Sequence, residues 1–251
     1  MKAVAVLPAR MGSTRFPGKP LALLLGRPMI EHCYRRVCMA RGLHEVIVAT
    51  CDQEIFEAVR VFGGQSAMTS PKHQRASDRV AEVAEKLDTD LIVMVQGDEP
   101  MVTPAMIEAA IQPFEQDKDL QCVNLTQKIE TEEEFQDPNT IKVVMDGNGD
   151  ALYFSREPVP TRRIMPFGKI TAYKQICIIP FRRDILLKYA RLEPTPLEIA
   201  ESVDMMRLIE HGFKVRMVET LESTHAVDTP EDLHRVEALL REDPLVRQYM
   251  T

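Results

Sequence analysis

Residues 3–21 read AVAVLPARMGSTRFPGKPL, and this stretch decides the fold more than any other part of the chain. Its first five residues, 3–7, are all apolar, which is typical of a strand buried on both faces of a sheet. A loop rich in Gly, Pro, Ser and Arg follows directly, over residues 8–20. Open α/β sheets bind their ligands beyond the carboxyl ends of such strands, so this loop is a candidate binding site.

The first half of the chain alternates between strand and helix patterns. Apolar runs predict further strands at residues 46–49 and 91–95, and helical spacing of apolar residues predicts helices over residues 29–40, 53–62 and 77–87. This alternation predicts an α/β fold with a mostly parallel central sheet and helices on both faces.

The second half is less regular. We expect short strands at residues 141–145, 151–154, 173–179 and 215–218, and helices at 183–190, 199–210 and 230–241. The acidic run 130–134 predicts a solvated loop or a helix start. No Gly/Ser-rich linker or internal repeat separates the halves, so we expect a single domain over residues 1–251, in which the second half supplies a lid or acceptor pocket.

Charge and cysteine content narrow the classes of function. The formal net charge of −7 argues against broad binding to nucleic acid or acidic lipid. The five cysteines are scattered without a C-x-x-C pair, which favours free thiols in a reducing cytosol. The first apolar stretch is too short for a signal peptide or a membrane helix. We expect a cytoplasmic protein without membrane insertion or nucleic-acid partners.

The loop after the first strand has the composition of a phosphate site. Gly12 lets the backbone approach a ligand closely, and amides around Ser13 can cradle phosphate oxygens. Arg10, Arg15 and Lys19 add three cations, as a triphosphate requires. The loop is neither a Walker P-loop nor a dinucleotide fingerprint, which disfavours P-loop kinases and Rossmann dehydrogenases. The alternative is a surface loop whose Gly and Pro residues only make turns.

Two aspartates are candidate metal ligands. Asp98 lies just past the apolar run 91–95, so we expect it in the crevice at the carboxyl edge of the sheet. A carboxylate there suits Mg²⁺, which fills its coordination shell with water and phosphate. Asp228 is the natural second ligand, although it could also cap a helix that has Pro230 near its start.

Four blocks, in this order along the chain, resemble the CMP-Kdo synthetases, also called 3-deoxy-manno-octulosonate cytidylyltransferases (Kdo, 3-deoxy-manno-octulosonate). They are residues 9–21, the sequence VQGDEP at 95–100, ALYFSR at 151–156 and VDTPEDL at 227–233. The resemblance covers nearly the whole chain. It implies the sugar nucleotidylyltransferase, GT-A-like fold, with a CTP-binding half at residues 1–125 and an acceptor-binding, lid and dimerisation half at residues 126–251.

The resemblance also implies an activity, namely the Mg²⁺-dependent transfer of CMP from CTP to the anomeric hydroxyl of Kdo or a close analogue. Pyrophosphate is released, and the enzyme is expected to be a homodimer that serves lipopolysaccharide or capsule synthesis. Asp98 and Asp228 would hold the metal, while Arg10, Arg15 and Lys19 would stabilise charge on the phosphates. The residues assigned to the nucleotide are Ala9, Gly12, Ser13, Ser77, Arg79 and Gln96.

Some positions depart from the family pattern. Arg75 and Ala76 stand where Ser-Gly is expected beside the cytosine, and Cys51 stands where an acidic residue is usual. On the acceptor side, Gln175 replaces a His and Ile179 a Tyr. Because these changes leave the phosphate and metal blocks intact, they predict preserved chemistry on an acceptor that could be Kdo, its 8-amino variant, a nonulosonate or a small phosphonate.

The acceptor site is expected to include Arg156, Gln175, Glu201 and Asp204. Glu201 and Asp204 would be i, i+3 neighbours on one face of a helix, which could also be only a solvated acidic face. Two other functions stay open. One is a nucleotidylyltransferase for a sugar 1-phosphate, and the other is a catalytically silent nucleotide-binding protein on the same fold.

Overall fold

The computed structural model describes residues 1–12 and 15–250, which form two compact units. Unit 1 contains Met1–Glu108 together with the C-terminal segment from Glu222, and unit 2 is Ala109–Leu221. The sequence suggested two halves of one domain that meet at residues 125 and 126. The units have different bounds, because the chain returns to unit 1 at Glu222.

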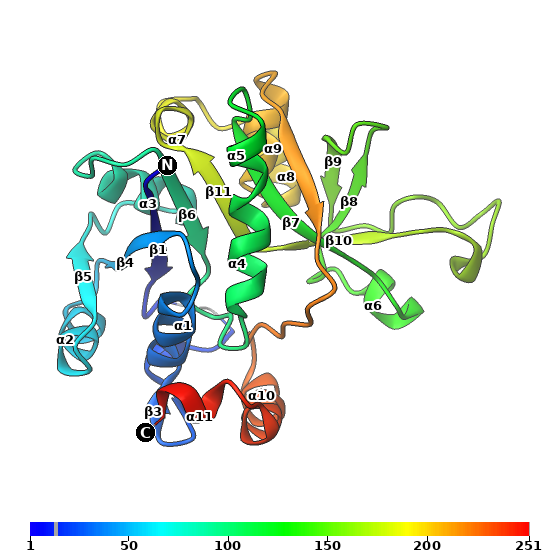
Figure 1. Cartoon of the computed structure of the whole chain (residues 1–251). Coiled ribbons are helices and arrows are strands. Elements are labelled where there is room, and N and C mark those ends of the chain that lie inside the picture. The colour runs from blue at the N-terminus through cyan, green and yellow to red at the C-terminus, as the bar shows by residue number, and fades with distance from the viewer. Residues whose placement is uncertain (13–14, 251) are drawn as a thin grey trace. The chain divides into compact units, whose positions relative to one another are not determined.

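Unit 1 is built on parallel strands with helices between them (Figure 1). The strand order is β5 (Gln65–Met68), β4 (Leu43–Thr50), β1 (Ala3–Ala9) and β6 (Leu91–Val95). The connecting helices are α1 (Met29–Cys38), α2 (Gln53–Val61) and α3 (Ala76–Ala84).

Every residue of β1 and β6 is buried, so this part of the sheet is covered on both faces. Helix α1 lies between β1 and β4 in the chain and α2 between β4 and β5, so the chain moves in one direction across the sheet. Helix α3 then connects β5 to β6, which lies on the other side of β1. Right-handed crossovers therefore place α3 on the opposite face from α1 and α2. The predicted α/β fold with a helix-covered parallel sheet is confirmed. The direction of winding reverses at β1, and this switch point is where such sheets bind ligands.

The other elements of unit 1 lie in the loop after β1, in the segment after β6 and in the C-terminal segment. They are η1 (Lys19–Leu21), β2 (Leu23–Leu24), β3 (Arg27–Pro28), α4 (Pro104–Ile111), α10 (Pro230–Glu242) and α11 (Val246–Tyr249); the boundary with unit 2 falls inside α4. Helix α1 holds the C-terminal segment, since Arg36 Nη1 lies 2.7 Å from Asp243 Oδ2. Within the described part of the chain, no helix is both long enough and apolar enough to cross a membrane.

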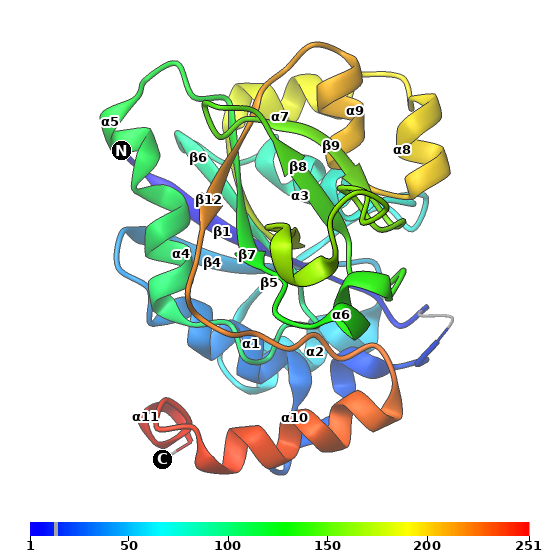
Figure 2. The ribbon, with the colours of Figure 1, turned by 90° about the vertical axis from the view of Figure 1, so that its right-hand side faces the viewer.

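Unit 2 is organised around β7 (Cys122–Lys128), which pairs antiparallel with β10 (Tyr173–Ile176) and β11 (Ile178–Arg182) and parallel with β12 (Val215–Glu219). A hairpin, β8 (Lys142–Met145) with β9 (Ala151–Ser155), adds to β10. The helices are α5 (Pro113–Gln116), α6 (Glu132–Gln136), η2 (Phe167–Lys169), α7 (Arg183–Tyr189), α8 (Pro196–Glu201) and α9 (Met205–Glu210). Figure 2 shows α9 beside β9. Helix α6 confirms the helix start predicted in the acidic run.

Two predictions for this half were wrong in detail. The strand expected over residues 173–179 is divided at Cys177, where the register along β7 shifts: Ile176 pairs with Leu125, but Phe181 pairs with Cys122. The helix expected over residues 199–210 is two helices, because Ser202 has φ = 53° and this left-handed conformation ends α8. Glu201 and Asp204 therefore do not share one helical face.

Candidate functional site

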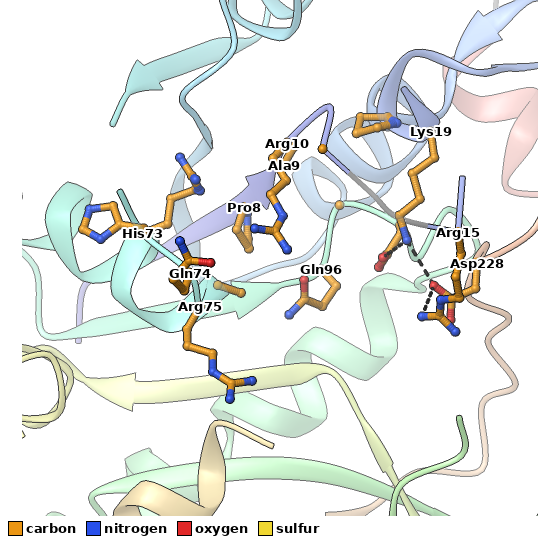
Figure 3. A pocket seen from close by; sticks show the side chains of 16 residues that line it. Pro8, Ala9, Arg10, Arg15, Lys19, His73, Gln74, Arg75, Gln96 and Asp228 are labelled. Atoms are coloured by element: carbon orange, nitrogen blue, oxygen red, sulfur yellow. Dashed lines mark hydrogen bonds and ion pairs between the residues drawn. The ribbon is translucent and has the colours of Figure 1, made fainter. Parts of the chain in front are cut away.

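A cavity of about 300 Å³ lies in unit 1 at the carboxyl ends of β1 and β6. Its walls come from the loop after β1, from the end of β6, from the start of α3 with the residues before it, and from Asp228 in the C-terminal segment. Figure 3 shows Lys19, Arg15 and Asp228 gathered at one end and His73 at the other, with Arg10 and Gln96 between them. This volume is within the range of small-molecule sites.

Most of the residues predicted for the nucleotide and the metal meet here. The predicted residues that line the cavity are Ala9, Arg10, Gly12, Arg15, Lys19, Arg79, Gln96, Asp98 and Asp228. Ser77 does not line it, because its side chain is fully buried, with the hydroxyl 3.9 Å from the sulfur of Met94. Ser13 lies outside the residues that the structure describes.

Four further lining residues are not among those predicted to bind the nucleotide or the metal, although Arg75 and Ala76 occupy the positions expected beside the cytosine. His73, Gln74, Arg75 and Ala76 form the wall next to Arg79. The sequence signal for them was the block at residues 72–79, which contains the small and cationic residues at the start of α3. From this block, the family resemblance predicts only Ser77 and Arg79 as nucleotide contacts.

Lys19 links the two candidate metal ligands. Its Nζ lies 2.5 Å from Asp98 Oδ2 and 3.2 Å from Asp228 Oδ1, and it also donates to the carbonyl oxygen of Val227 at 3.1 Å. Burial lowers the pKa of Lys19, but the two carboxylates outweigh burial and the pKa lies above its ordinary value of 10.5. Lys19 is therefore a permanent cation at neutral pH.

Asp228 is held in the cavity and is not used as a helix cap. The N-cap of α10 is Thr229, whose hydroxyl accepts from the backbone N–H of Asp232. The carboxylate of Asp228 instead contacts two cations of the loop, with Oδ1 2.9 Å from Arg15 Nη2 as well as near Lys19. Thr229 therefore caps the helix, and the carboxylate of Asp228 contacts cations of the loop.

The charge of the cavity suits a polyanion. The charged residues that line it are the cations Arg10, Arg15, Lys19, Arg75 and Arg79 and the anions Asp98 and Asp228, so cations exceed anions by three (five minus two). The whole chain carries a net charge of −7, which makes this local excess specific to the site. Clustered arginine side chains bind phosphate oxygens in bidentate geometry, so the cavity fits a triphosphate.

Two features fix the shape of the loop and the cavity wall. The backbone N–H of Met11 donates to Asp52 Oδ2 at 2.8 Å, and the carbonyl of Met11 accepts from Gly18 N at 3.0 Å, which closes the loop at its base. At the end of β6, a Cβ on Gly97 would lie 2.9 Å from the carbonyl oxygen of Pro8. Only glycine allows β6 to end this close to β1.

The opposite end of the cavity is ordered by a carboxylate behind it. His73 Nε2 lies 2.5 Å from Glu82 Oε2, and that oxygen also accepts from the backbone N–H of Ser70 at 2.8 Å. Burial raises the pKa of Glu82, but the hydrogen bonds from Ser70 and His73 outweigh it and leave the pKa below its ordinary value. Glu82 therefore remains ionised and holds the ring of His73 at the cavity wall.

The residues predicted for the acceptor all lie in unit 2, where two of them form a cluster. Glu201 accepts from the hydroxyl of Tyr153 and from the backbone N–H of Arg156, each at 2.8 Å. The Arg156 side chain in turn donates to the carbonyl of Glu201 at 2.7 Å. Gln175 Nε2 donates to Asn124 Oδ1 at 2.6 Å, and Asp204 directly precedes α9.

The cavity and its residues agree with the similarity of the chain to known proteins. Residues 4–243 match the cytidylyltransferase family model. The chain is 47% identical to the 3-deoxy-manno-octulosonate cytidylyltransferase of Geobacter metallireducens over 94% of this chain and 96% of the relative, and 45% identical to the enzyme of the same name from Geotalea uraniireducens over 94% and 98%.

A solved structure, CMP:2-keto-3-deoxy-manno-octonic acid synthetase complexed with CTP, superposes with a TM-score of 0.90 at 41% identity, over 96% of this chain and 99% of that one. The same family therefore emerges from the sequence relatives and from the fold. The chain belongs to the cytidylyltransferases, and among them to the 3-deoxy-manno-octulosonate cytidylyltransferase family.

Proposed function

We propose that this chain transfers the cytidylyl group of CTP to the anomeric hydroxyl of Kdo or a close analogue and releases pyrophosphate. The observation that carries the proposal is the cavity at the switch point of unit 1, where five cations and two carboxylates face one another. Relatives that share up to 47% identity over nearly the whole chain bear the name of this activity. The structure of a relative in complex with CTP supports the choice of nucleotide.

The reaction is an in-line displacement at phosphorus. The anomeric oxygen of the acid forms a bond with the α-phosphorus of CTP, the bond from that phosphorus to the bridging oxygen breaks, and pyrophosphate leaves while the hydroxyl proton passes to solvent. The work of the protein in such a transfer is positioning and neutralisation of charge. Arg10, Arg15 and Lys19 line the cavity and supply the positive charge that the phosphates and the departing pyrophosphate require.

Asp98 and Asp228 fit a magnesium ion bound together with nucleotide. Their oxygens reach one common cation, the ammonium of Lys19, although they come from distant segments of the chain. Among the described residues, no three His, Cys, Asp or Glu side chains gather as an all-protein metal site. Mg²⁺ commonly takes one or two carboxylates and completes its shell with phosphate and water. When bound, it would neutralise phosphate charge and favour ionisation of the acceptor hydroxyl.

The remaining residues of the cavity would bind the rest of the nucleotide. Arg79 and Gln96 line the cavity, and Ala9 and Gly12 would allow close approach of the backbone to the nucleotide. Ser77 would act indirectly, because its side chain is fully buried and does not line the cavity. Ser13 would contribute its amide to the phosphates.

The acceptor is proposed to bind through unit 2, where Arg156, Gln175, Glu201 and Asp204 are located. The amide nitrogen of Gln175 is engaged by Asn124, so Gln175 retains its carbonyl oxygen as an acceptor for a ligand. A histidine in its place would offer a ring N–H. This difference favours an acid that presents a donor at that position, and 8-amino-Kdo is therefore the second candidate acceptor.

The deciding experiment is pyrophosphate release with CTP and Mg²⁺ over a panel of Kdo, 8-amino-Kdo, neuraminic-type acids and simple phosphonates. We expect rapid release with Kdo, 8-amino-Kdo or both. Release only with 8-amino-Kdo would make Gln175 the first residue to exchange for His. CTP binding without release for any acid would refute the transferase and favour a silent nucleotide-binding protein.

We further propose that the enzyme works in the cytoplasm as a homodimer. All five cysteines carry free thiols, which suits a reducing compartment. Unit 2 exposes apolar side chains, among them Leu152 on β9 at 57% and Ile199 on α8 at 63%. Light scattering during size exclusion should give twice the chain mass. I199E places a charge at one of these exposed apolar positions and should lower that mass.

A further inference from the structure

The segment before Asp228 is attached directly to the segment that carries Asp98. The hydroxyl of Thr224 donates to Glu99 Oε2 at 2.6 Å, and the backbone N–H of Val227 donates to the carbonyl of Asp98 at 2.9 Å. These two contacts join residues 224–227 to residues 98–99, far apart in the chain. The second of these contacts is made by the residue directly before Asp228.

The contact between Thr224 and Glu99 has the geometry of a strong hydrogen bond. A hydroxyl that donates to a carboxylate at 2.5–2.7 Å makes a charge-assisted bond, about twice as strong as a neutral one. Glu99 is buried, with 8% of its surface exposed. Because a buried carboxylate binds its donors firmly, the Thr224 hydroxyl anchors its segment at a defined place.

Asp228 is also fixed from the side that follows it. Its backbone N–H donates to Asp232 Oδ2 at 3.0 Å, and the capping box of Thr229 and Asp232 secures the start of α10. The residue therefore lies between two anchors, the first turn of α10 and the contact of Thr224 with Glu99. Between them, the backbone of Asp228 has little freedom to move away from Asp98.

We propose that Thr224 and Glu99 form a clamp that positions Asp228 for the metal. Neither residue lines the cavity, so both are positioning residues and act through Asp228. The inference rests on the proposed function for the identity of the metal site. Partners that orient metal ligands from behind commonly change metal affinity about tenfold or more when they are lost.

Metal binding tests the clamp without turnover. Mn²⁺ binding to the full chain is measured by electron paramagnetic resonance with a CTP analogue whose α,β-bridge is a methylene group. T224V removes the hydroxyl, T224S retains it, and T89V is the matched control. Thr89 donates to the carbonyl of Lys2 at 2.7 Å, at the opposite edge of the sheet from the cavity.

We expect T224V to weaken Mn²⁺ binding about tenfold, while metal-free binding of the analogue and the melting temperature stay near those of the wild type. T224S and T89V should bind Mn²⁺ like the wild type. If T224V does not fold, T224A removes the same donor without adding a methyl group and should give the same loss.

Wild-type Mn²⁺ affinity in a folded T224V or T224A protein would overturn the clamp. A parallel loss of metal binding, nucleotide binding and melting temperature would also overturn it, since it would show a general structural role. Failure of the proposed function looks different: the wild-type protein would release no pyrophosphate with any acid, whatever the Mn²⁺ measurements give.

Discussion

Lys19 Nζ lies 2.5 Å from Asp98 Oδ2, and this ion pair joins the loop after β1 to the end of β6. Only 12% of the Lys19 side chain and 26% of the Asp98 side chain are exposed. Solvent therefore screens the pair less than it screens an ordinary surface ion pair. The same ammonium contacts Asp228, so one cation keeps two carboxylates close together at one end of the cavity.

Replacing Lys19 should abolish most of the activity. K19M leaves Asp98 and Asp228 facing each other without their shared cation and removes a positive charge from the phosphate end. We expect kcat/KM for pyrophosphate release to fall about 100-fold or more, as for loss of one preorganised charge-stabilising group. K19R keeps the charge with a different geometry and should retain part of the activity.

The matched control is K128M, because Lys128 pairs with Glu219 at 3.8 Å in an exposed position of unit 2. An exposed pair of this kind contributes little, so K128M should behave like the wild type. Steady-state kinetics at saturating Mg²⁺ give both values. Near-normal kcat/KM in K19M would remove Lys19 from the proposed site.

Asp52 should control nucleotide affinity through the loop. Its Oδ2 accepts from the backbone N–H of Met11, and it makes no side-chain cap bond to α2, although it occupies the N-cap position of that helix. D52A therefore releases the loop without removing a helix cap. We expect the KM for CTP to rise about tenfold or more, because a hydrogen bond to a charged group contributes about 1.5–3 kcal/mol, and we expect a smaller change in kcat.

D52N is the conservative companion, since its amide oxygen can still accept from Met11. It should lie between D52A and the wild type in KM. Both proteins are compared with the wild type over a range of CTP concentrations at saturating acid. An unchanged KM in D52A would show that the loop keeps its shape without this contact.

The parts of the site that the sequence predicted are those that follow from strand order. The runs 3–7 and 91–95 are apolar throughout, and the carboxyl ends of parallel strands meet at one edge. Arg10, Lys19 and Asp98 each follow such an end, so their convergence could be expected. Asp228 could be named as a candidate ligand, but no local pattern shows which distant segment returns to that edge, so its position there was supported by the family resemblance.

What the sequence could not predict depends on tertiary contacts. Strand β7 was missed because its buried side chains include Asn124 and Thr126, which interrupt the apolar pattern. Their hydrogen-bond partners, the carbonyls of Ile176 and Lys174, lie about fifty residues away. The break between α8 and α9 was missed for a similar reason. Glu201, at the end of α8, is held by Tyr153 of β9 and by Arg156, which directly follows β9.

Gly97 should not tolerate even the smallest side chain. In G97A the new Cβ would lie 2.9 Å from the carbonyl oxygen of Pro8 and 3.0 Å from Ile30 Cδ1. A backbone oxygen in a central strand cannot move away cheaply, so we expect the free energy of unfolding in urea to fall by about 1–3 kcal/mol. G147A is the control, because a Cβ at Gly147 meets nothing within 4 Å. Equal stability of G97A and G147A would contradict the close approach of β6 to β1.

The last prediction concerns the phenol of Tyr153. Its hydrogen bond to Glu201 and its burial raise the pKa of Tyr153 to about 12, from the ordinary value of 10.0. Ionisation would place a second negative charge beside the carboxylate. Because the folded protein stabilises the protonated phenol, this contribution to stability is complete below pH 10 and is lost as the pH rises from 10 to about 12.

An alkaline titration followed by ultraviolet difference absorbance, wild type minus Y153F, isolates this one tyrosine. E201Q removes the charge of the partner, so the Tyr153 transition should move back toward pH 10, whereas E219Q, on β12, should leave it near 12. A Tyr153 transition at pH 10 in the wild type would show that the phenol does not contact Glu201 in solution. It would also remove one contact between β9 and the end of α8, so that the arrangement of Arg156 and Glu201 proposed for the acceptor would rest on their two mutual hydrogen bonds.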